Sequence, residues 1–441
     1  MTHSIERREF LKVVPFIVSS WASAAYAQNR TDDEITQLFD IAAAKHRREL
    51  TDLWDGRGAP PVYLPNVSSD SITRLFSQDL RYIVYPEQTA LLFYSYDEEN
   101  LQSWLVNECG IQAYQKQNIS KQHISEAIAN LRHSLNVDSV QRSRVPRPRA
   151  NAIEVVPIIT PTRESREQTI ANLTQILLPA SISNKLETVK HLIIVPILEI
   201  GTVPYAILKP FDDSSFLIER MSISIAPSLF DLGQIISGVW PLSRSPLIVG
   251  NPYLPESEDW FVPPLPGAEQ EAQAVANLMD TVPLLGRNAT KTKIVNRATG
   301  ASLLYFATHG VASSDRPLSE GFLMLSAPTF SEGWWTAREI QNTRLTAEIA
   351  VLSACQTGLG QTHDAGTIGL ARAFQIAGVP RVVMSLWSVD DRATSELMQA
   401  FVRHLANHLP SEALRQAMLE IRQEYPEPSK WASFTVFGTE R

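Results

Sequence analysis

From about residue 153 onward, short apolar runs alternate with amphipathic stretches of helical period, and this alternation constrains the fold more than any other feature. In one amphipathic stretch, Leu397, Phe401 and Leu405 repeat every four residues and form one apolar face. Strands that are buried on both faces and joined by crossover helices form a mostly parallel sheet. The sequence therefore predicts an α/β fold, a mostly parallel sheet flanked by helices. The expected strands are HLIIVP (191–196), MSISIAPS (221–228), PLIVGNP (246–252), ASLLYFATHG (301–310), EIAVLSAC (348–355), RVVMSLWSV (381–389) and ASFTVFG (432–438).

The preceding part of the chain has a different pattern. Residues 30–55 have the polar character of a surface helix, and TALLFYSY (89–96), SWLVNE (103–108) and IQAYQ (111–115) predict a small antiparallel meander. Residues 120–135 predict a helix that buries Ile124, Ile128 and Leu131. The next segment, DSVQRSRVPRPRAN (138–151), holds four arginines and two prolines without apolar periodicity, and indicates a solvated linker. We predict an amino-terminal region (28–137), this linker (138–151) and a larger domain (152–441).

The first 27 residues have the order of a bacterial export signal. A charged segment, ERREFLK (6–12), precedes the apolar stretch VVPFIVSSWASAAYA (13–27), which ends in the small-residue pattern Ala25-Tyr26-Ala27. Arg7 and Arg8 resemble a twin-arginine signal. The sequence thus predicts cleavage after Ala27 and export through the twin-arginine pathway, with a periplasmic location. The alternative interpretation is an amphipathic amino-terminal helix.

Charge and cysteine content exclude several classes of function. The net charge of −8 argues against a general nucleic-acid binder, which needs a surplus of clustered Lys and Arg. Cys109 and Cys355 are the only cysteines, so there is no disulfide framework and no cysteine-rich metal site. Prolines and glycines interrupt every long apolar stretch after the signal, which predicts no integral membrane segment in the mature chain. We expect no cofactor and no metal.

Reactive side chains follow three of the predicted strands. His309 and Cys355 follow two of them, and Asp390 and Asp391 follow a third. If these strands are neighbours in a parallel sheet, their carboxyl ends place the side chains along one edge, where such sheets bind ligands.

A thiol and an imidazole at adjacent strand ends suit nucleophilic catalysis. An adjacent imidazole favours the thiolate and later protonates the leaving amine. Gly310 allows a substrate carbonyl close to the backbone, so that the amides of Gly310 and Cys355 bind the oxyanion. The plain alternatives are a histidine with backbone hydrogen bonds and a cysteine that only packs. Together, the two residues match the caspase order, with the histidine about 50 residues upstream of the cysteine.

The segments around these residues resemble the CHAT family, a caspase-like domain family related to separases. The resemblance covers about residues 150–441, with weaker likeness back to about residue 75. It is carried by LLYFATHG, LTAEIAVLSACQTGLG, IGLARAFQIAGVPRVVMSLWSVDDRAT and WASFTVFG, and is supported upstream by HLIIVP, PYAIL, FLIERMSISIAPSLF and LPGAEQEAQAVANLM.

The resemblance implies a cysteine endopeptidase with a dyad of His309 and Cys355, acting on protein or peptide substrates. In the separase relatives an acidic residue shapes the pocket for the P1 side chain. The WSVDD stretch looks like its counterpart, which implies that Asp390 or Asp391 receives a basic P1 residue. Where many family members carry an acidic residue before GLARAF, this chain has Ala365 with Asp364 beside it. Asp364 is therefore a further candidate for substrate binding.

Three alternatives remain open. The first is a CHAT fold kept as a non-catalytic scaffold or interaction module, which would not need the histidine, the cysteine and their flanking glycines. The second is a metal site of His309, Cys355 and His363, which lacks a fourth ligand; His363 also competes with His309 as the base. The third is a disulfide between Cys109 and Cys355 that holds the thiol inactive after export. The sequence does not predict an oligomeric state.

Overall fold

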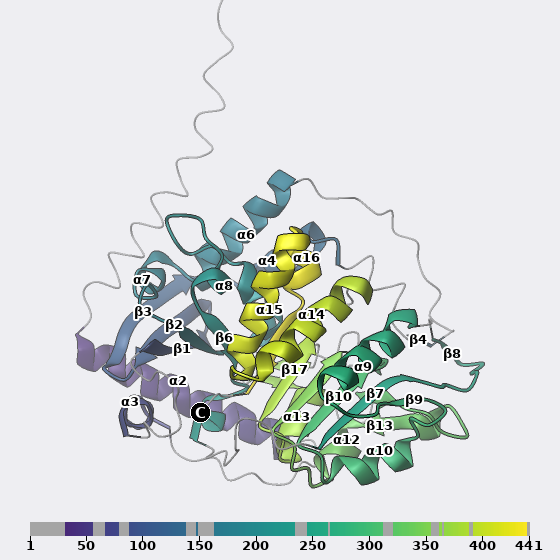
Figure 1. Ribbon diagram of the computed structural model, residues 1–441. Helices are drawn as coiled ribbons and strands as arrows, with labels where there is room; N and C mark the ends of the chain where they lie inside the picture. The colour runs from purple at the N-terminus through teal and green to yellow at the C-terminus, as the bar shows by residue number, and fades with distance from the viewer. Residues whose placement is uncertain are drawn as a thin grey trace, which may run out of the picture.

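The computed structural model describes residues 31–55, 67–78, 88–137, 147–148, 163–233, 245–262, 265–311, 321–353, 361–363, 366–387 and 391–438. Its centre is one 11-stranded sheet in the order β3-β2-β1-β5-β6-β18-β17-β14-β10-β7-β9 (Figure 1). Seven of the ten strand pairs in this sheet are parallel, so the predicted mostly parallel sheet is confirmed.

Five neighbouring parallel strands form one half of the sheet. Their register places equivalent residues of adjacent strands side by side, as in Leu303 beside Ile349 and Ile349 beside Arg381. All their carboxyl ends therefore lie along the same edge. The strands are β17 (Arg381–Ser385), β14 (Ile349–Ser353), β10 (Leu303–Ala307), β7 (Pro246–Pro252) and β9 (Leu284–Gly286).

The last strand, β18 (Phe434–Phe437), runs antiparallel to β17. Between them the chain forms the two long helices α14 (Asp391–Leu405) and α15 (Pro410–Glu424) and the short α16 (Pro428–Trp431). One helix would carry the chain back to the start of a parallel strand. A second long helix returns it to the edge that it left, and this makes β18 antiparallel.

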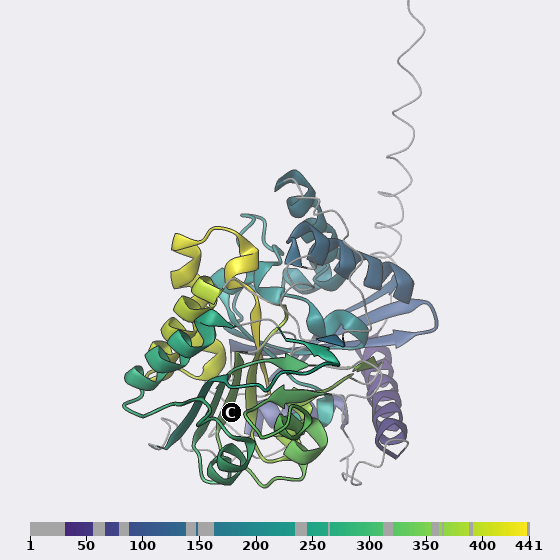
Figure 2. The same cartoon turned by 90° about the vertical axis from the view of Figure 1, so that its right-hand side faces the viewer.

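Helices cover both faces of this half. One face carries α9 (Pro266–Leu278), α14 and α15, which lie together in Figures 1 and 2. The opposite face carries α10 (Lys291–Ala298), α12 (Ala337–Gln341) and α13 (Leu370–Ile376). Alternate residues of β10 enter the two cores, with Leu303 and Tyr305 on the α9 side and Leu304 and Phe306 on the α13 side. Leu397, Phe401 and Leu405 of α14 are buried, as predicted.

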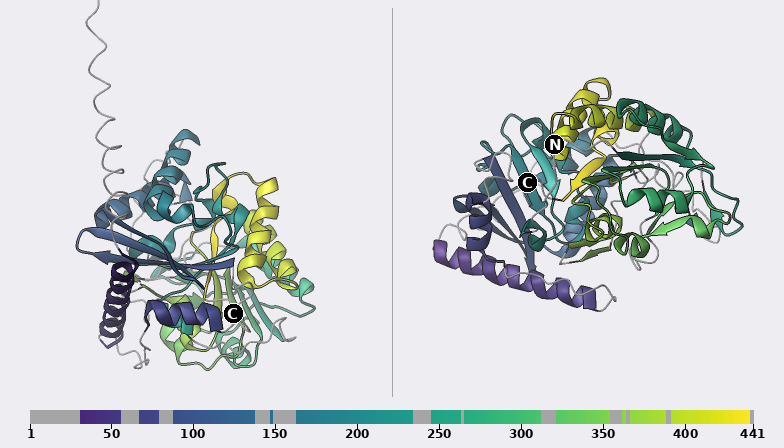
Figure 3. Two further views of the ribbon diagram at one scale, coloured as in Figure 1. Left: turned by 90° about the vertical axis from the view of Figure 1, so that its left-hand side faces the viewer. Right: turned by 60° about the horizontal axis from the view of Figure 1, so that its bottom comes forward.

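The predicted meander forms from β1 (Thr89–Asp97), β2 (Asn100–Asn107) and β3 (Gly110–Asn118). It is continuous with the rest of the sheet, because β1 pairs in parallel with β5 (His191–Val195), which pairs with β6 (Ser222–Ile225). Helices α4 (Lys121–Ser134), α6 (Arg163–Leu177) and α7 (Ala180–Ser183) cover one face. Helices α2 (Asp32–Asp55) and α3 (Ser69–Gln78) cover the other (Figure 3). Ile124, Ile128 and Leu131 are buried, as predicted.

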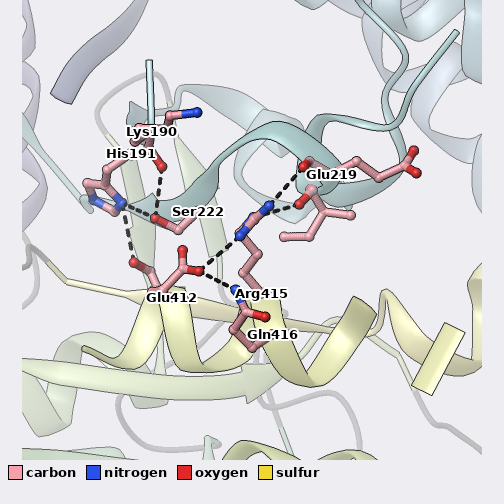
Figure 4. Close-up of polar contacts among 9 residues, drawn as sticks. Lys190, His191, Glu219, Ser222, Glu412, Arg415 and Gln416 are labelled. Atoms are coloured by element: carbon pink, nitrogen blue, oxygen red, sulfur yellow. Dashed lines mark hydrogen bonds and ion pairs between the residues drawn. The ribbon is translucent and has the colours of Figure 1, made fainter. Parts of the chain in front are cut away.

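Helix α15 ties the two halves together through polar contacts (Figure 4). Arg415 donates to the carbonyl oxygens of Ile218 and Glu219, each at 2.8 Å, and to the carboxylate of Glu412 at 2.9 Å. Near the start of α15, the hydroxyl of Ser411 lies 3.2 Å from Nδ1 of His191, the first residue of β5. These contacts fix the helix across the junction between β6 and β18.

Several short elements complete the described structure. The sequence predicted none of the three small sheets among them: β11 (Gly310–Val311), β12 (Phe322–Met324) and β13 (Trp334–Thr336); β15 (Gln361–His363) and β16 (Gly366–Ile368); and β4 (Arg147–Pro148) with β8 (Trp260–Phe261). The remaining elements are α8 (Leu217–Arg220) and the 3-10 turns η2 (Leu198–Thr202), η3 (Tyr205–Ile207), η4 (Leu229–Gly233) and η5 (Ser331–Gly333). No helix within the described ranges has the length and apolar character to cross a bilayer.

Candidate active site

The strand ends that precede His309 and Cys355 are neighbours at the same level. Strands β10 and β14 pair in parallel, and their last residues, Ala307 and Ser353, lie opposite each other. His309 follows Ala307 by two positions, and Cys355 follows Ser353 by two positions. Strand β17 lies on the other side of β14, with Met384 beside Leu352. The adjacency on which the predicted dyad depends is therefore present, although Cys355 itself lies outside the described residues.

Backbone and side-chain hydrogen bonds hold the position of His309. The hydroxyl of Thr308 donates to the carbonyl oxygen of Met324 at 2.7 Å, and the amide of Met324 donates to the carbonyl oxygen of His309 at 2.9 Å. Both contacts join the end of β10 to β12. Only 3% of His309 is exposed. The histidine is thus fixed at the strand end by a second, small sheet.

Gly310 is the first residue of β11, the edge strand of that small sheet. It lies opposite Leu323, and the amide of Met324 bonds to His309 rather than to Gly310. In an antiparallel ladder this pattern makes Gly310 a residue of a non-hydrogen-bonded pair, whose own N–H points away from the partner strand. The Gly310 amide therefore faces away from β12, beside the histidine.

A cleft of about 1020 Å³ opens beside His309 at the carboxyl ends of β7, β9 and β10. Its charged lining residues are two carboxylates, Glu256 and Glu258, and the lining residues that the structure describes include no Lys or Arg. The guanidinium of Arg287 lies nearby, 3.5 Å from the ring centroid of Tyr253. The lining residues are Asn251, Pro252, Tyr253, Leu254, Pro255, Glu256, Ser257, Glu258, Trp260, Phe261, Val262, Leu265, Gly286, Thr308 and His309.

Four aromatic side chains, which we call the aromatic group, join the cleft wall to the small sheet. They are Trp260, Phe322, Phe330 and Trp334. The rings of Phe322 and Trp334 stack with their centroids 4.4 Å apart, and the ring of Trp260 meets that of Trp334 edge-on at 5.5 Å. This packing holds β8 against the small sheet of β11, β12 and β13, which also fixes the position of His309.

The sequence did not predict the cleft wall at residues 251–262. These residues follow the predicted strand 246–252 directly, so the rule that placed His309 and Cys355 at the strand ends also applied to them. The signal was available, but the acidic residues of this segment that line the cleft, Glu256 and Glu258, come four and six positions after the predicted strand.

The other predicted site residues lie in different places. Asp391 is the first residue of α14, six positions after the last residue of β17, while Asp390 and Asp364 lie outside the described residues. Next to this junction, the indole N–H of Trp387 donates to the carbonyl oxygen of Ser429 at 3.0 Å. His363 belongs to β15, and the β15–β16 hairpin contacts η2.

A buried polar chain lies beneath the site. Tyr305 in β10 donates its hydroxyl hydrogen bond to the carboxylate of Glu271 in α9 at 2.6 Å, and it also has a hydrogen bond with Ser353. Burial, followed by the charge of Glu271, raises the pKa of Tyr305 well above its usual value. These hydrogen bonds connect Ser353, at the end of β14, through Tyr305 to Glu271 in α9.

Cys109 is a free, exposed thiol in the turn between β2 and β3. Strand β2 lies six strand positions from β14 in the sheet order. At the usual spacing of strands this is a separation of roughly 29 Å, whereas the Cα atoms of a disulfide lie about 4.4–6.8 Å apart. The hypothesis of a Cys109–Cys355 disulfide within one chain is therefore not supported.

Histidine, cysteine and acidic side chains do not gather into a metal site anywhere in the described part of the chain. The described residues of the cleft contribute one imidazole and two carboxylates, and the structure does not group them as a set of metal ligands.

Comparison with known proteins identifies relatives of part of this chain. Residues 167–439 match the family model of the CHAT domain. Tetratricopeptide repeat protein 28 is 29% identical over 289 residues in Mus musculus, and 28% identical over 298 residues in Homo sapiens. These matches cover 55% and 57% of this chain but only 12% of each relative.

Among solved structures, the Saccharomyces cerevisiae separase–securin complex has a similar fold. In one structure of the complex the match has a TM-score of 0.55 with 11% identity, and covers 96% of this chain and 35% of that chain. A second structure of the complex gives a TM-score of 0.51 over 84% of this chain and 31% of that chain. At such low identity the likeness concerns the fold alone, and it confirms the caspase-like fold class.

Proposed function

This chain belongs to the CHAT domain family, and from that premise we propose that it is a cysteine endopeptidase that cleaves protein or peptide substrates with a dyad of Cys355 and His309. One observation carries the proposal. The last residues of the adjacent parallel strands β10 and β14, Ala307 and Ser353, lie opposite each other. The histidine and the cysteine each follow two positions later in the sequence, and His309 lines a cleft.

The proposed reaction has two steps. The Cys355 thiolate attacks the carbonyl carbon of the scissile bond, and the carbon–nitrogen bond breaks as the His309 imidazolium gives its proton to the leaving amine. Water, deprotonated by the imidazole, then attacks the thioester and releases the acid, and the thiol is restored. The amides of Gly310 and Cys355 stabilise the oxyanion in both steps. The orientation of the Gly310 N–H, away from β12, supports this assignment.

A substrate with a basic residue at the cleavage site suits the charges around the cleft. Glu256 and Glu258 line the cleft, and Asp391 begins α14, six positions after the end of β17, the strand next to β14. Asp390, Asp391 and Asp364 remain the proposed partners of the P1 side chain, because a carboxylate pairs most strongly with Arg or Lys when water is excluded.

A fluorogenic peptide library tests the assignment. The mature protein is compared with the Cys355→Ala and His309→Ala variants, and Cys109→Ala serves as the matched control for loss of a thiol. We expect turnover after Arg or Lys in the wild type and in Cys109→Ala, and a loss of at least a thousandfold in the other two variants. Equal turnover by Cys355→Ala would exclude Cys355 as the nucleophile. No turnover by any form would favour the non-catalytic scaffold.

We also propose that the protein is exported by the twin-arginine pathway. Arg7, Arg8 and the Ala25-Tyr26-Ala27 pattern support this proposal, and all lie outside the described residues. This pathway carries folded proteins, which suits a single sheet whose strands come from both ends of the chain.

A further inference from the structure

Two residues of the predicted linker form a strand on the cleft wall. Arg147 and Pro148 form β4, which pairs antiparallel with β8, so that Arg147 lies opposite Phe261 and Pro148 opposite Trp260. Figure 1 shows β4 and β8 side by side at the edge of the molecule beyond β9. The predicted linker is thus held by its backbone at this point.

Strand β8 is part of the cleft that contains His309. Trp260, Phe261 and Val262 all line the cleft. Trp260 is anchored by the aromatic group, whereas 39% of Phe261 is exposed. A strand with one fixed side chain and an accessible edge can take up an extended peptide by main-chain hydrogen bonds, a common mode of peptide recognition. Here β4 occupies that position.

The charges of segment 138–151 and of the cleft also favour the pairing of β4 with β8. The segment 138–151 carries four arginines, Arg142, Arg144, Arg147 and Arg149, against a single acidic residue, Asp138. The lining of the cleft carries Glu256 and Glu258. Guanidinium and carboxylate groups form strong, charge-assisted hydrogen bonds. An extended basic peptide therefore matches the cleft both in backbone conformation and in charge.

We propose that β8 is the docking strand for basic extended peptides, and that the chain's own segment 138–151 occupies it as a pseudosubstrate that competes with external substrates. The competition between this segment and external substrates rests on the proposed function. Because the segment belongs to the same chain, its effective concentration at β8 is of the millimolar order expected for a short tether. Only peptides that displace it gain access to the cleft.

Peptide binding tests the proposal without relying on catalysis. All proteins carry Cys355→Ala and Cys109→Ala, and the probe is a fluorescent peptide with the sequence of residues 142–150, RSRVPRPRA. A release variant replaces Arg142, Arg144, Arg147 and Arg149 with Gln. A lock variant carries Arg147→Cys and Phe261→Cys, since directly opposed residues of antiparallel strands have Cα atoms about 4.5–5.5 Å apart, within the range of a disulfide. The charge control replaces Arg166 and Arg338 with Gln, outside the cleft.

We expect the release variant to bind the probe at least tenfold more tightly than the parent, and the charge control to bind it like the parent. The oxidised lock variant should bind at least tenfold more weakly, and reductant should reverse this. Equal binding by the parent, the release variant and the oxidised lock variant would overturn the proposal. Since every protein lacks Cys355, a failure of the peptidase assignment leaves this result interpretable. Thermal unfolding of each variant separates a loss of binding from a loss of folding.

Discussion

A Cβ atom added at Gly250 would lie 2.3 Å from the Cβ of Ala272, because α9 packs directly onto β7 at this point. It would also lie 3.0 Å from the carbonyl oxygen of Ala268. Helix α9 carries Glu271 and lies over the strand that leads into the cleft wall. The close approach of Gly250 and Ala272 therefore sets the distance between this helix and the sheet beneath the site.

Gly250→Ala should destabilise the protein by about 1–3 kcal/mol, because the added methyl group forces the helix and the strand apart. Denaturant unfolding gives the free energy. Gly300→Ala is the matched control, since a Cβ there meets no atom within 4 Å. Ala272→Gly in the Gly250→Ala background should recover part of the loss. Equal stability of Gly250→Ala and Gly300→Ala would contradict the packing argument.

Tyr305→Phe should cost about 1–3 kcal/mol of unfolding free energy, because the Glu271 carboxylate, which is 4% exposed, loses a hydrogen-bond donor. Tyr96→Phe is the control: its hydroxyl donates at 2.5 Å to the neutral carbonyl oxygen of Ile119, so its loss should cost less. In a double-mutant cycle with Glu271→Gln, the two costs should not add. Additive costs would show that the two residues are not coupled.

Acid should destabilise the protein through His191. Burial lowers the pKa of this imidazole from 6.5 to about 4, while its ring nitrogens have Ser222 Oγ at 2.9 Å and Ser224 Oγ at 3.1 Å. Between these two pH values the unfolded chain binds a proton that the folded chain does not. The contribution of the neutral His191 to the free energy of unfolding is thus complete above about pH 6.5 and falls as the pH drops to about 4. It amounts to roughly 3 kcal/mol.

Unfolding free energies of the wild type and of His191→Gln, measured from pH 7 to pH 4, check this expectation. The wild type should lose more stability over this range than the variant, whatever the stability of the variant at pH 7. Parallel pH profiles for the two proteins would exclude His191 as the source.

The two cysteines should differ in reactivity. With Cys109→Ala, alkylation by iodoacetamide at pH 6 reports on Cys355, and with Cys355→Ala it reports on the exposed thiol of Cys109. If His309 stabilises the Cys355 thiolate, Cys355 should react at least tenfold faster than Cys109. His309→Ala should remove most of this difference. Rates that do not respond to His309→Ala would separate the histidine from the thiol.

Replacing Arg7 and Arg8 with lysine should leave the precursor in the cytoplasm, if the twin-arginine assignment is correct. Cell fractionation and the mass of the amino terminus measure processing after Ala27. Arg47 and Arg48 in α2 form a second arginine pair, and their replacement by lysine is the matched control. Normal export of the Arg7 and Arg8 variant would contradict the proposal.

The strands and the faces of the helices could be predicted from local sequence. The burial of each element is recorded in the spacing of its own apolar residues, as with Leu397, Phe401 and Leu405 of α14. His309 could be proposed for the same reason, because a polar residue just after a buried strand must lie at an edge of the sheet.

Only the tertiary structure decided which distant segments pair with one another. It joined the meander to the main sheet through β1 and β5, reversed β18 relative to β17, and placed Arg147 and Pro148 against β8. It also assembled the cleft wall from the segment that follows β7, around Trp260 and its aromatic partners. The periodicity of a segment says which of its faces is buried. The partner that covers that face is chosen by complementarity with residues far away in the chain, and local sequence does not record that choice.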